Sequence, residues 1–150
     1  TWIDSTVFLS APIPGYIKKS NFFAFRDTFG LIENPAWVSN WFIHCSKNND
    51  CMRQIRNVMF AYWTKQKYVM EYLLCYIVMT MVLEKNKLLD AMPYANSDYS
   101  HLLFNALDEP FSEDKYAHIS ELTQIHKLSY KLQESVLNSN STFYSYILSL

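Results

Sequence analysis

Near its start the chain reads Trp2-Ile3-Asp4-Ser5-Thr6-Val7-Phe8-Leu9. The β-branched and aromatic side chains of this stretch predict a buried strand over residues 2–9. Pro12-Ile13-Pro14-Gly15 follows and predicts a turn, because proline restricts φ and glycine tolerates unusual dihedral angles. A carboxylate and two hydroxyls interrupt the apolar stretch. Burying them is unfavourable unless they are paired, so the segment that decides the fold also holds the first candidate site.

Two further strands are predicted downstream. They cover Phe22-Phe23-Ala24-Phe25 and Trp41-Phe42-Ile43-His44-Cys45, and the breaker Asn34-Pro35 precedes the second of them. Each predicted strand is short and apolar, as is typical of strands inside a covered sheet.

Beyond these strands the hydrophobic spacing becomes helical. Apolar residues recur every three or four positions from Asn49 onward, which predicts an amphipathic helix. A second helix is predicted over residues 67–87 and a short amphipathic one over residues 99–107. Residues 113–137 mix helix with irregular structure, and residues 143–150 form a hydrophobic segment that must dock on the core.

The middle of the second predicted helix, residues 72–83, is apolar on all sides. A membrane span needs about 20 such residues, and this run is shorter and is bounded by Glu71 and Glu84. Two interpretations stay open, a buried core helix and a helix that lies on a membrane surface.

Composition limits the classes of protein that fit. The 150 residues, half of them hydrophobic, are enough for one domain with a real core. A net charge of −1 argues against a nucleic-acid partner, which usually meets a basic excess. The two glycines, Gly15 and Gly30, exclude a Walker loop and a dinucleotide fingerprint, since both need several glycines close together.

The cysteines and histidines point to no reactive centre. Cys45, Cys51 and Cys75 form no CxxC pair, and their odd number indicates structural thiols in a reducing compartment. The four histidines are dispersed and lack metal-ligand spacing. The chain starts at Thr1 directly with a predicted strand, without a secretory signal, so we expect it to be a piece of a longer protein.

Two places carry candidate site residues. Ligands bind at strand ends in open α/β sheets, so Asp4 is a candidate oxygen ligand for Mg²⁺ or Mn²⁺. The alternative is a structural aspartate that bonds to backbone or caps a turn. Asn40 offers a donor and an acceptor, and Trp41 offers a flat apolar face for a sugar or a base. The alternative for this pair is a turn residue beside a core aromatic.

Several segments together resemble the bacterial capsular polysaccharide synthesis proteins. The stretch from Trp2 to Val7 is similar to the Trp-Ile-Asp-Ala-Thr-Val stretch of that family. The similarity continues, in order and over almost the whole chain, through residues 22–25, 39–43, 62–63, 72–74 and 126–131. The family is related to DXD-containing sugar transferases of the GT-A type.

The resemblance implies an α/β fold class, with a partial GT-A, Rossmann-like fold in which short strands precede a helical C-terminal part. Residues 1–150 would form a single domain that lacks its N-terminal nucleotide-binding strands. The implied function is a glycosyltransferase that moves a sugar from a nucleotide-sugar donor to a saccharide acceptor during capsular or surface polysaccharide synthesis. In such enzymes the DXD segment holds a divalent cation, Mn²⁺ or Mg²⁺, that bridges the diphosphate of the donor.

Site residues follow from the same resemblance. Asp4 matches the first acid of the motif and is the expected contact to the metal or to ribose. Thr6 stands where the second acid would be, and a hydroxyl is a weaker, neutral ligand. Ser5, Asn40 and Trp41 would line the donor or sugar pocket, and no catalytic base is identified.

A non-catalytic or degenerate transferase domain that binds an assembly partner is the alternative function. The expected location is cytoplasmic, at the inner face of the membrane if the second helix lies on lipid. The sequence says nothing about the oligomeric state.

Overall fold

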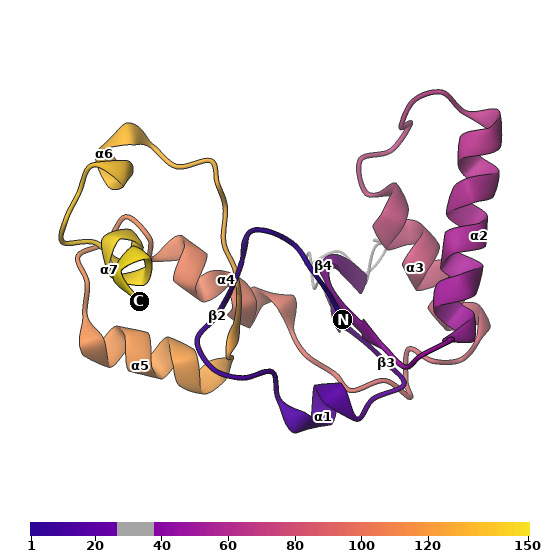
Figure 1. Ribbon diagram of the computed structural model, residues 1–150, viewed down its shortest axis with the longest axis horizontal. Coiled ribbons are helices and arrows are strands. Elements are labelled where there is room, and N and C mark those ends of the chain that lie inside the picture. The colour runs from indigo at the N-terminus through magenta and orange to yellow at the C-terminus, as the bar shows by residue number, and fades with distance from the viewer. Residues whose placement is uncertain (27–37) are drawn as a thin grey trace. The chain divides into compact units, whose positions relative to one another are not determined.

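The computed structural model describes residues 1–26 and 38–150 (Figure 1). These residues group into two compact units. Unit 1 comprises Thr1–Ile3 and Gly15–Ser97, and unit 2 comprises Asp4–Pro14 and Asp98–Leu150. Each unit is described by itself. The predicted breaker Asn34-Pro35, together with Gly30, lies outside the described residues.

Unit 1 contains a three-stranded antiparallel sheet in the order β1-β4-β3. Its strands are β1 (Trp2–Ile3), β3 (Phe22–Arg26) and β4 (Val38–Cys45). Helix α1 (Gly15–Lys18) leads into β3. The predicted strands at residues 22–25 and 41–45 are confirmed, and most of their side chains are buried, as expected of a covered sheet.

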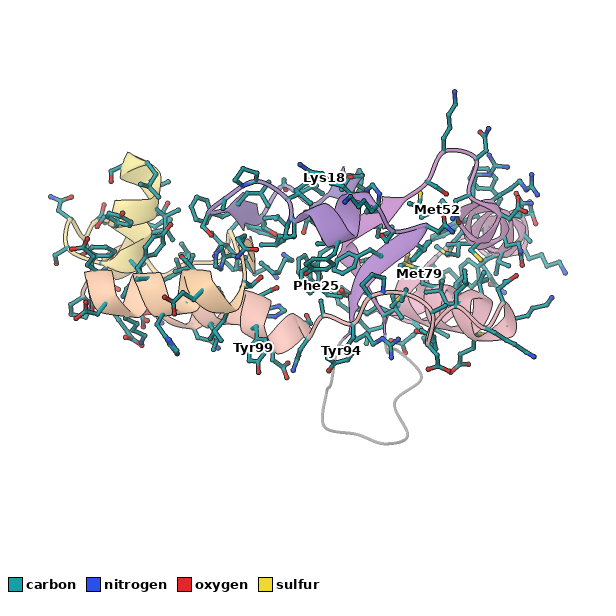
Figure 2. The ribbon with its side chains drawn as sticks, turned by 90° about the horizontal axis from the view of Figure 1, so that it is seen from below. Lys18, Phe25, Met52, Met79, Tyr94 and Tyr99 are labelled. Carbon is teal, nitrogen blue, oxygen red and sulfur yellow. The ribbon has the colours of Figure 1, made fainter. Side chains whose placement is uncertain are left out.

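Alternation along β3 divides its side chains between the two faces of the sheet. Phe22 and Ala24 belong to a core cluster with the helices of unit 1. Phe23 and Phe25 instead pack edge-on against Phe42 of β4, with ring centroids 6.0 and 5.9 Å away. Phe25, labelled in Figure 2, also stacks on Trp41 at 4.5 Å. This aromatic group fills one face of the sheet.

Two helices cover the other face. Helix α2 (Asp50–Lys65) begins at Asn49, whose side-chain oxygen accepts a hydrogen bond from the Met52 amide at 3.0 Å. Such a cap satisfies an amide that would otherwise lack a partner at the helix start. Helix α3 (Leu74–Lys85) lies alongside α2 (Figure 1). Met79 belongs to the core cluster of unit 1, and Met52 packs against that cluster (Figure 2).

The predicted helix over residues 67–87 is too long at its start. The structure has no helix between α2 and Leu74, and the Tyr62 hydroxyl organises the connection there. It donates to the Tyr68 carbonyl at 3.1 Å and accepts from the Met70 amide at 3.0 Å. These bonds give the backbone partners that a helix would otherwise supply.

Across residues 1–26 and 38–150, no helix combines the length and the hydropathy that crossing a membrane requires.

Unit 2 is built around a two-stranded antiparallel sheet of β2 (Val7–Leu9) and β5 (Ile125–Lys127). Four helices complete this part of the chain. They are α4 (Ser97–Asn105), α5 (Glu113–Leu122), α6 (Glu134–Leu137) and α7 (Phe143–Ser149). The fully buried Phe143 anchors α7 in a core with Leu103 and Ile119. Docking of the predicted hydrophobic segment 143–150 is thereby confirmed.

The prediction of one buried strand over residues 2–9 is wrong. The stretch forms two short strands in two different sheets, and Trp2 is 62% exposed. Between the strands the Val7 amide donates to the Asp4 carbonyl at 3.0 Å and closes a turn. Asp and Ser favour such turns because their side chains compete for nearby backbone groups.

The described residues confirm a mixed α/β class, in which β1 to β4 precede α2 and β5 lies between α5 and α6. Both described sheets are antiparallel and small. The Rossmann-like GT-A fold, and the single domain lacking its first strands, therefore stay predictions.

Candidate functional site

The turn between β1 and β2 carries Asp4, and pairing of β2 with β5 brings a lysine to it. Val7 lies opposite Lys127 in the antiparallel register. Just beyond that pair, the Leu128 amide donates to the Thr6 carbonyl at 2.9 Å. The backbone therefore fixes the end of β5 beside the turn, although the two segments are far apart in sequence.

Polar side chains meet at this point of unit 2. Asp4 Oδ2 pairs with Lys127 Nζ at 3.1 Å and accepts a hydrogen bond from Thr6 Oγ1 at 3.0 Å. Lys127 Nζ also donates to Thr6 Oγ1 and, at 3.1 Å, to the Leu128 carbonyl. The Ser5 hydroxyl reaches Asp4 Oδ1 at 3.4 Å. We call Asp4, Ser5, Thr6 and Lys127 the Asp4–Lys127 cluster.

Asp4 is held in its charged form. Desolvation by itself raises the pKa of the Asp4 carboxyl, but hydrogen bonds from Lys127 and Thr6, with the lysine charge, outweigh it. The pKa therefore lies below its ordinary value of 3.8. The side chains of Lys127 and Asp4 are 20% and 36% exposed, so the ion pair is within reach of a ligand from solvent.

A divalent cation fits the Asp4–Lys127 cluster poorly. Mg²⁺ and Mn²⁺ prefer several oxygen ligands, whereas the cluster has one carboxylate, and its Oδ2 is already paired with the ammonium. Within the part of the chain that the structure describes, no three His, Cys, Asp or Glu side chains gather to hold a metal ion. A charge of +2 about 4 Å from the ammonium is repelled by about 2 kcal/mol even at the dielectric constant of water. The Mn²⁺ or Mg²⁺ site at Asp4 stays a prediction.

The other predicted site residues, Asn40 and Trp41, lie on β4 in unit 1. Asn40 is half-buried. Trp41 is 3% exposed, and Phe25 stacks on one face of its indole. The structure therefore brings Asp4, Ser5 and Thr6 together in one unit and places Asn40 and Trp41 in the other. A role of these two side chains toward a sugar stays a prediction.

Lys127 has no role in the sequence-based hypothesis. It falls within the stretch 126–131 that resembles the family, but β5 has only three residues. So short a strand has no periodicity that could be recognised. A pairing between β2 and a segment more than a hundred residues away leaves no local signal, and the contact is visible only in the fold.

His126, the neighbour of Lys127, is a buried polar residue. Its Nε2 lies 3.0 Å from the Ser10 hydroxyl and its ring stacks on Phe8 at 5.8 Å, while Nδ1 has no hydrogen-bond partner among residues 1–26 and 38–150. Burial lowers the pKa of His126 from 6.5 to about 4. The imidazole is therefore neutral at pH 7, and its protonation opposes the folded state.

We expect this burial to make stability depend on pH. The unfolded state takes up a proton on His126 below about pH 6.5, and the folded state does so only near pH 4. The free energy of unfolding should therefore fall as the pH is lowered from 6.5 to 4, by up to about 1.4 kcal/mol per pH unit. Urea unfolding of the full-length protein at pH 7 and pH 5 measures the effect. His126→Gln should flatten the dependence, whereas the same change at the exposed His118 should preserve it. If His126→Gln has the same pH dependence of stability as the wild type, other titratable groups cause that dependence.

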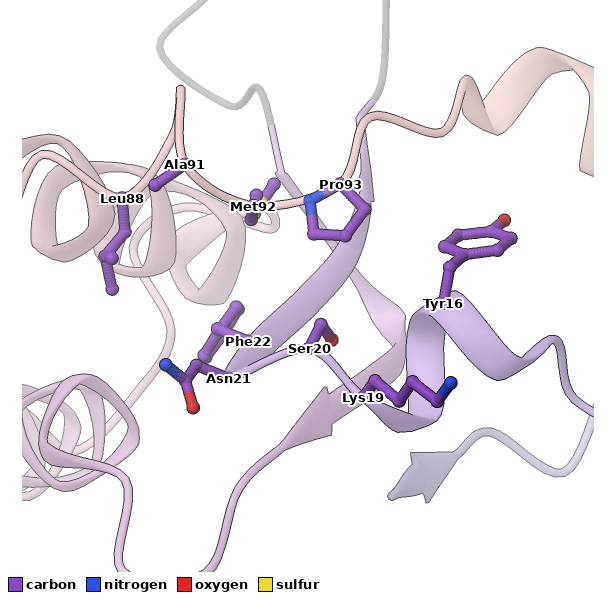
Figure 3. Close-up of a pocket in the computed structure, with 9 residues that line it drawn as sticks. All are labelled: Tyr16, Lys19, Ser20, Asn21, Phe22, Leu88, Ala91, Met92 and Pro93. Carbon is purple, nitrogen blue, oxygen red and sulfur yellow. The ribbon is translucent and has the colours of Figure 1, made fainter.

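Unit 1 contains a separate hollow of about 310 Å³. Figure 3 shows that α1 and the start of β3 form one side of it and the segment after α3 the other. The lining mixes apolar and polar side chains, and none of the predicted site residues is among them. It consists of Tyr16, Lys19, Ser20, Asn21, Phe22, Leu88, Ala91, Met92 and Pro93.

Comparison with known proteins gives one result. The family described as "Capsular polysaccharide synthesis protein" matches residues 1–147, nearly the whole chain. No curated protein and no solved structure matches the chain. The match includes both halves of the Asp4–Lys127 cluster, the turn near the start and the strand β5. The chain belongs to the capsular polysaccharide synthesis protein family.

Proposed function

We propose that the protein is a glycosyltransferase that takes a sugar from a nucleotide-sugar donor and adds it to a saccharide acceptor. Family membership implies a role in capsular polysaccharide synthesis, and growth of a polysaccharide requires sugar transfer. The observation that carries the proposal is the Asp4–Lys127 cluster. It presents an ionised carboxylate and an ammonium together, both partly exposed, at the turn that resembles the donor-binding segment of sugar transferases.

The proposed reaction exchanges one bond at the anomeric carbon for another. The bond from this carbon to the β-phosphate oxygen breaks, and its electron pair leaves with the nucleoside diphosphate. A bond to the acceptor hydroxyl oxygen forms, and the hydroxyl proton passes to solvent water. The barrier falls when fixed charges stabilise the negative charge that develops on the leaving diphosphate.

Within the proposed site, Asp4 acts on hydroxyl groups. Its Oδ1 accepts a long bond of 3.4 Å from the Ser5 hydroxyl, and since a carboxylate oxygen can accept two hydrogen bonds, it has acceptor capacity for a ribose or sugar hydroxyl. On the strength of the family resemblance, Asn40 and Trp41 are proposed separately as sugar-binding residues of unit 1. We also propose a cytoplasmic location, because nucleotide-sugars are made inside the cell.

A screen for sugar transfer tests the proposal. The full-length protein is incubated with sugar derivatives of UDP, GDP, CDP and dTDP, and release of the nucleotide is measured with and without Mn²⁺. We expect release above the protein-free rate for at least one donor, through transfer or slow hydrolysis. A folded protein that releases no nucleotide and binds none in calorimetry would contradict the transferase proposal.

One observation favours the alternative, a degenerate transferase domain that binds an assembly partner. Thr6 occupies the place of the second acid, and its hydroxyl is engaged by both Asp4 and Lys127. A self-satisfied polar cluster of this kind also serves structure alone. The screen separates the two functions, because a degenerate domain leaves every donor intact while it still folds.

A further inference from the structure

We propose that the Lys127 ammonium is the positive group that binds the donor diphosphate, in the place that a divalent cation takes in two-acid transferases. The inference rests on the proposed transferase function and names the group that recognises the phosphates. It arises from the poor fit of a cation to the Asp4–Lys127 cluster and from the contacts of the lysine itself.

The backbone holds the lysine in place before any ligand arrives. Lys127 ends β5 opposite Val7, and the Leu128 amide bonds to the Thr6 carbonyl on the other side of it. Its side chain is further fixed by Asp4 Oδ2 and Thr6 Oγ1. A flexible lysine loses side-chain entropy when it binds a ligand, and here folding has already ordered it.

The charges of the cluster add up as they do in a metal site. Two acids of a DXD motif and one divalent cation sum to zero, and Asp4 with Lys127 also sum to zero. Thr6 is neutral in the place of the second acid, so the cluster needs one positive charge to balance its carboxylate. The ammonium supplies that charge 3.1 Å from Asp4 Oδ2.

A phosphate can reach the ammonium without breaking its ion pair with Asp4. Lys127 Nζ contacts three oxygens, Asp4 Oδ2, Thr6 Oγ1 and the Leu128 carbonyl, one for each of its three N–H donors. A phosphate oxygen is charged and the carbonyl is neutral, so the phosphate is the stronger acceptor and can displace it. When the bond to the anomeric carbon breaks, its electron pair stays on the diphosphate, and the ammonium balances this charge without giving up a proton.

Calorimetry in the presence and absence of metal tests the inference. UDP, GDP, CDP and dTDP are titrated into the full-length protein, once with EDTA and once with Mn²⁺. We expect at least one of them to bind in EDTA. Lys127→Met should weaken this binding by about 10- to 100-fold, the range expected for hydrogen bonds to a charged group. Lys127→Arg keeps the charge and should retain part of the affinity.

Lys115 provides a matched control. It belongs to the same unit and is also ion-paired, with Glu109, so Lys115→Met removes a comparable surface pair far from the turn in sequence. Its affinity should equal that of the wild type. Binding that requires Mn²⁺ and is unchanged in Lys127→Met overturns the inference while leaving the transferase proposal standing. Absence of binding under both conditions by the folded wild type overturns both.

A second measurement avoids any risk that Lys127→Met fails to fold. Reductive methylation of the wild-type protein labels accessible lysines, and mass spectrometry reads each site. The nucleotide that binds in EDTA should slow labelling of Lys127 and leave Lys115 unchanged. Equal labelling of Lys127 with and without the bound nucleotide contradicts direct contact.

Discussion

Asp4→Asn in the full-length protein is expected to lower the rate of sugar transfer by about a hundredfold or more, the loss typical when one fixed charge of a catalytic site is removed. The substitution keeps the shape of the side chain and its ability to accept hydrogen bonds from Thr6 and Lys127. It removes the negative charge that orients the ammonium. Initial rates of nucleotide release, measured with the donor found in the screen, give the effect.

The control for this prediction is a second aspartate in unit 2. Asp108 is exposed, and Asp108→Asn should leave the transfer rate unchanged. The melting temperature of Asp4→Asn should stay within a few degrees of the wild type, since a partly exposed ion pair contributes about 1 kcal/mol or less. A wild-type transfer rate in Asp4→Asn would remove Asp4 from the site.

Phe42→Ala is expected to cost the greatest stability, about 3–5 kcal/mol in the free energy of unfolding. Phe42 is completely buried in the middle of β4. Its ring packs edge-on against Phe23 and Phe25, so alanine leaves a cavity lined by aromatic rings that cannot easily collapse. Thermal and urea unfolding of the full-length protein measure the loss.

Phe60 offers the matched control, because it is the same residue type on α2 with 64% of its surface exposed. Phe60→Ala should change the free energy of unfolding by about 0.5 kcal/mol or less. Equal losses for the two variants would mean that the aromatic group does not hold the sheet of unit 1 together.

Helices with a clear apolar spacing were predictable from the sequence. The helix predicted from Asn49 onward has apolar residues every three or four positions, and α2 follows that prediction closely. The second helix was overestimated at its start because hydropathy continues through Tyr68 and Met70. There the Tyr62 hydroxyl provides backbone partners outside a helix, and no local pattern reveals such a contact.

Strands were predictable where they are apolar throughout, as β3 is. The stretch over residues 2–9 was misread because its polar centre was taken as an interruption in one strand. It is in fact a turn between two strands, β1 and β2, that enter different sheets. The partner of β2, the three-residue β5, was not predicted, since strands this short are specified by long-range pairing rather than by their own composition.

The candidate site was predictable only in part. Asp4, Ser5 and Thr6 stand out because polar residues are unexpected in an apolar stretch, and the structure shows how Asp4 is paired. The identity of the partner, Lys127, depends on strand register. Trp41 was considered for its flat ring, which in the structure is buried against Phe25. Sequence alone does not distinguish an aromatic residue of the core from one that binds a ligand, because the residue type is the same in both roles.

The interleaving of the two units has a consequence for synthesis of the chain on the ribosome. Lys127 follows Thr6 by 121 positions, and all of Gly15–Ser97 is made between them. At about 5–20 residues per second, β2 waits roughly six seconds or more for its partner strand. Throughout that interval its hydrogen-bonding edge is unpaired, and such an edge can pair with other chains. A charged side chain beside a strand edge opposes pairing with other chains, and Asp4 places such a charge next to β2 before Lys127 is made.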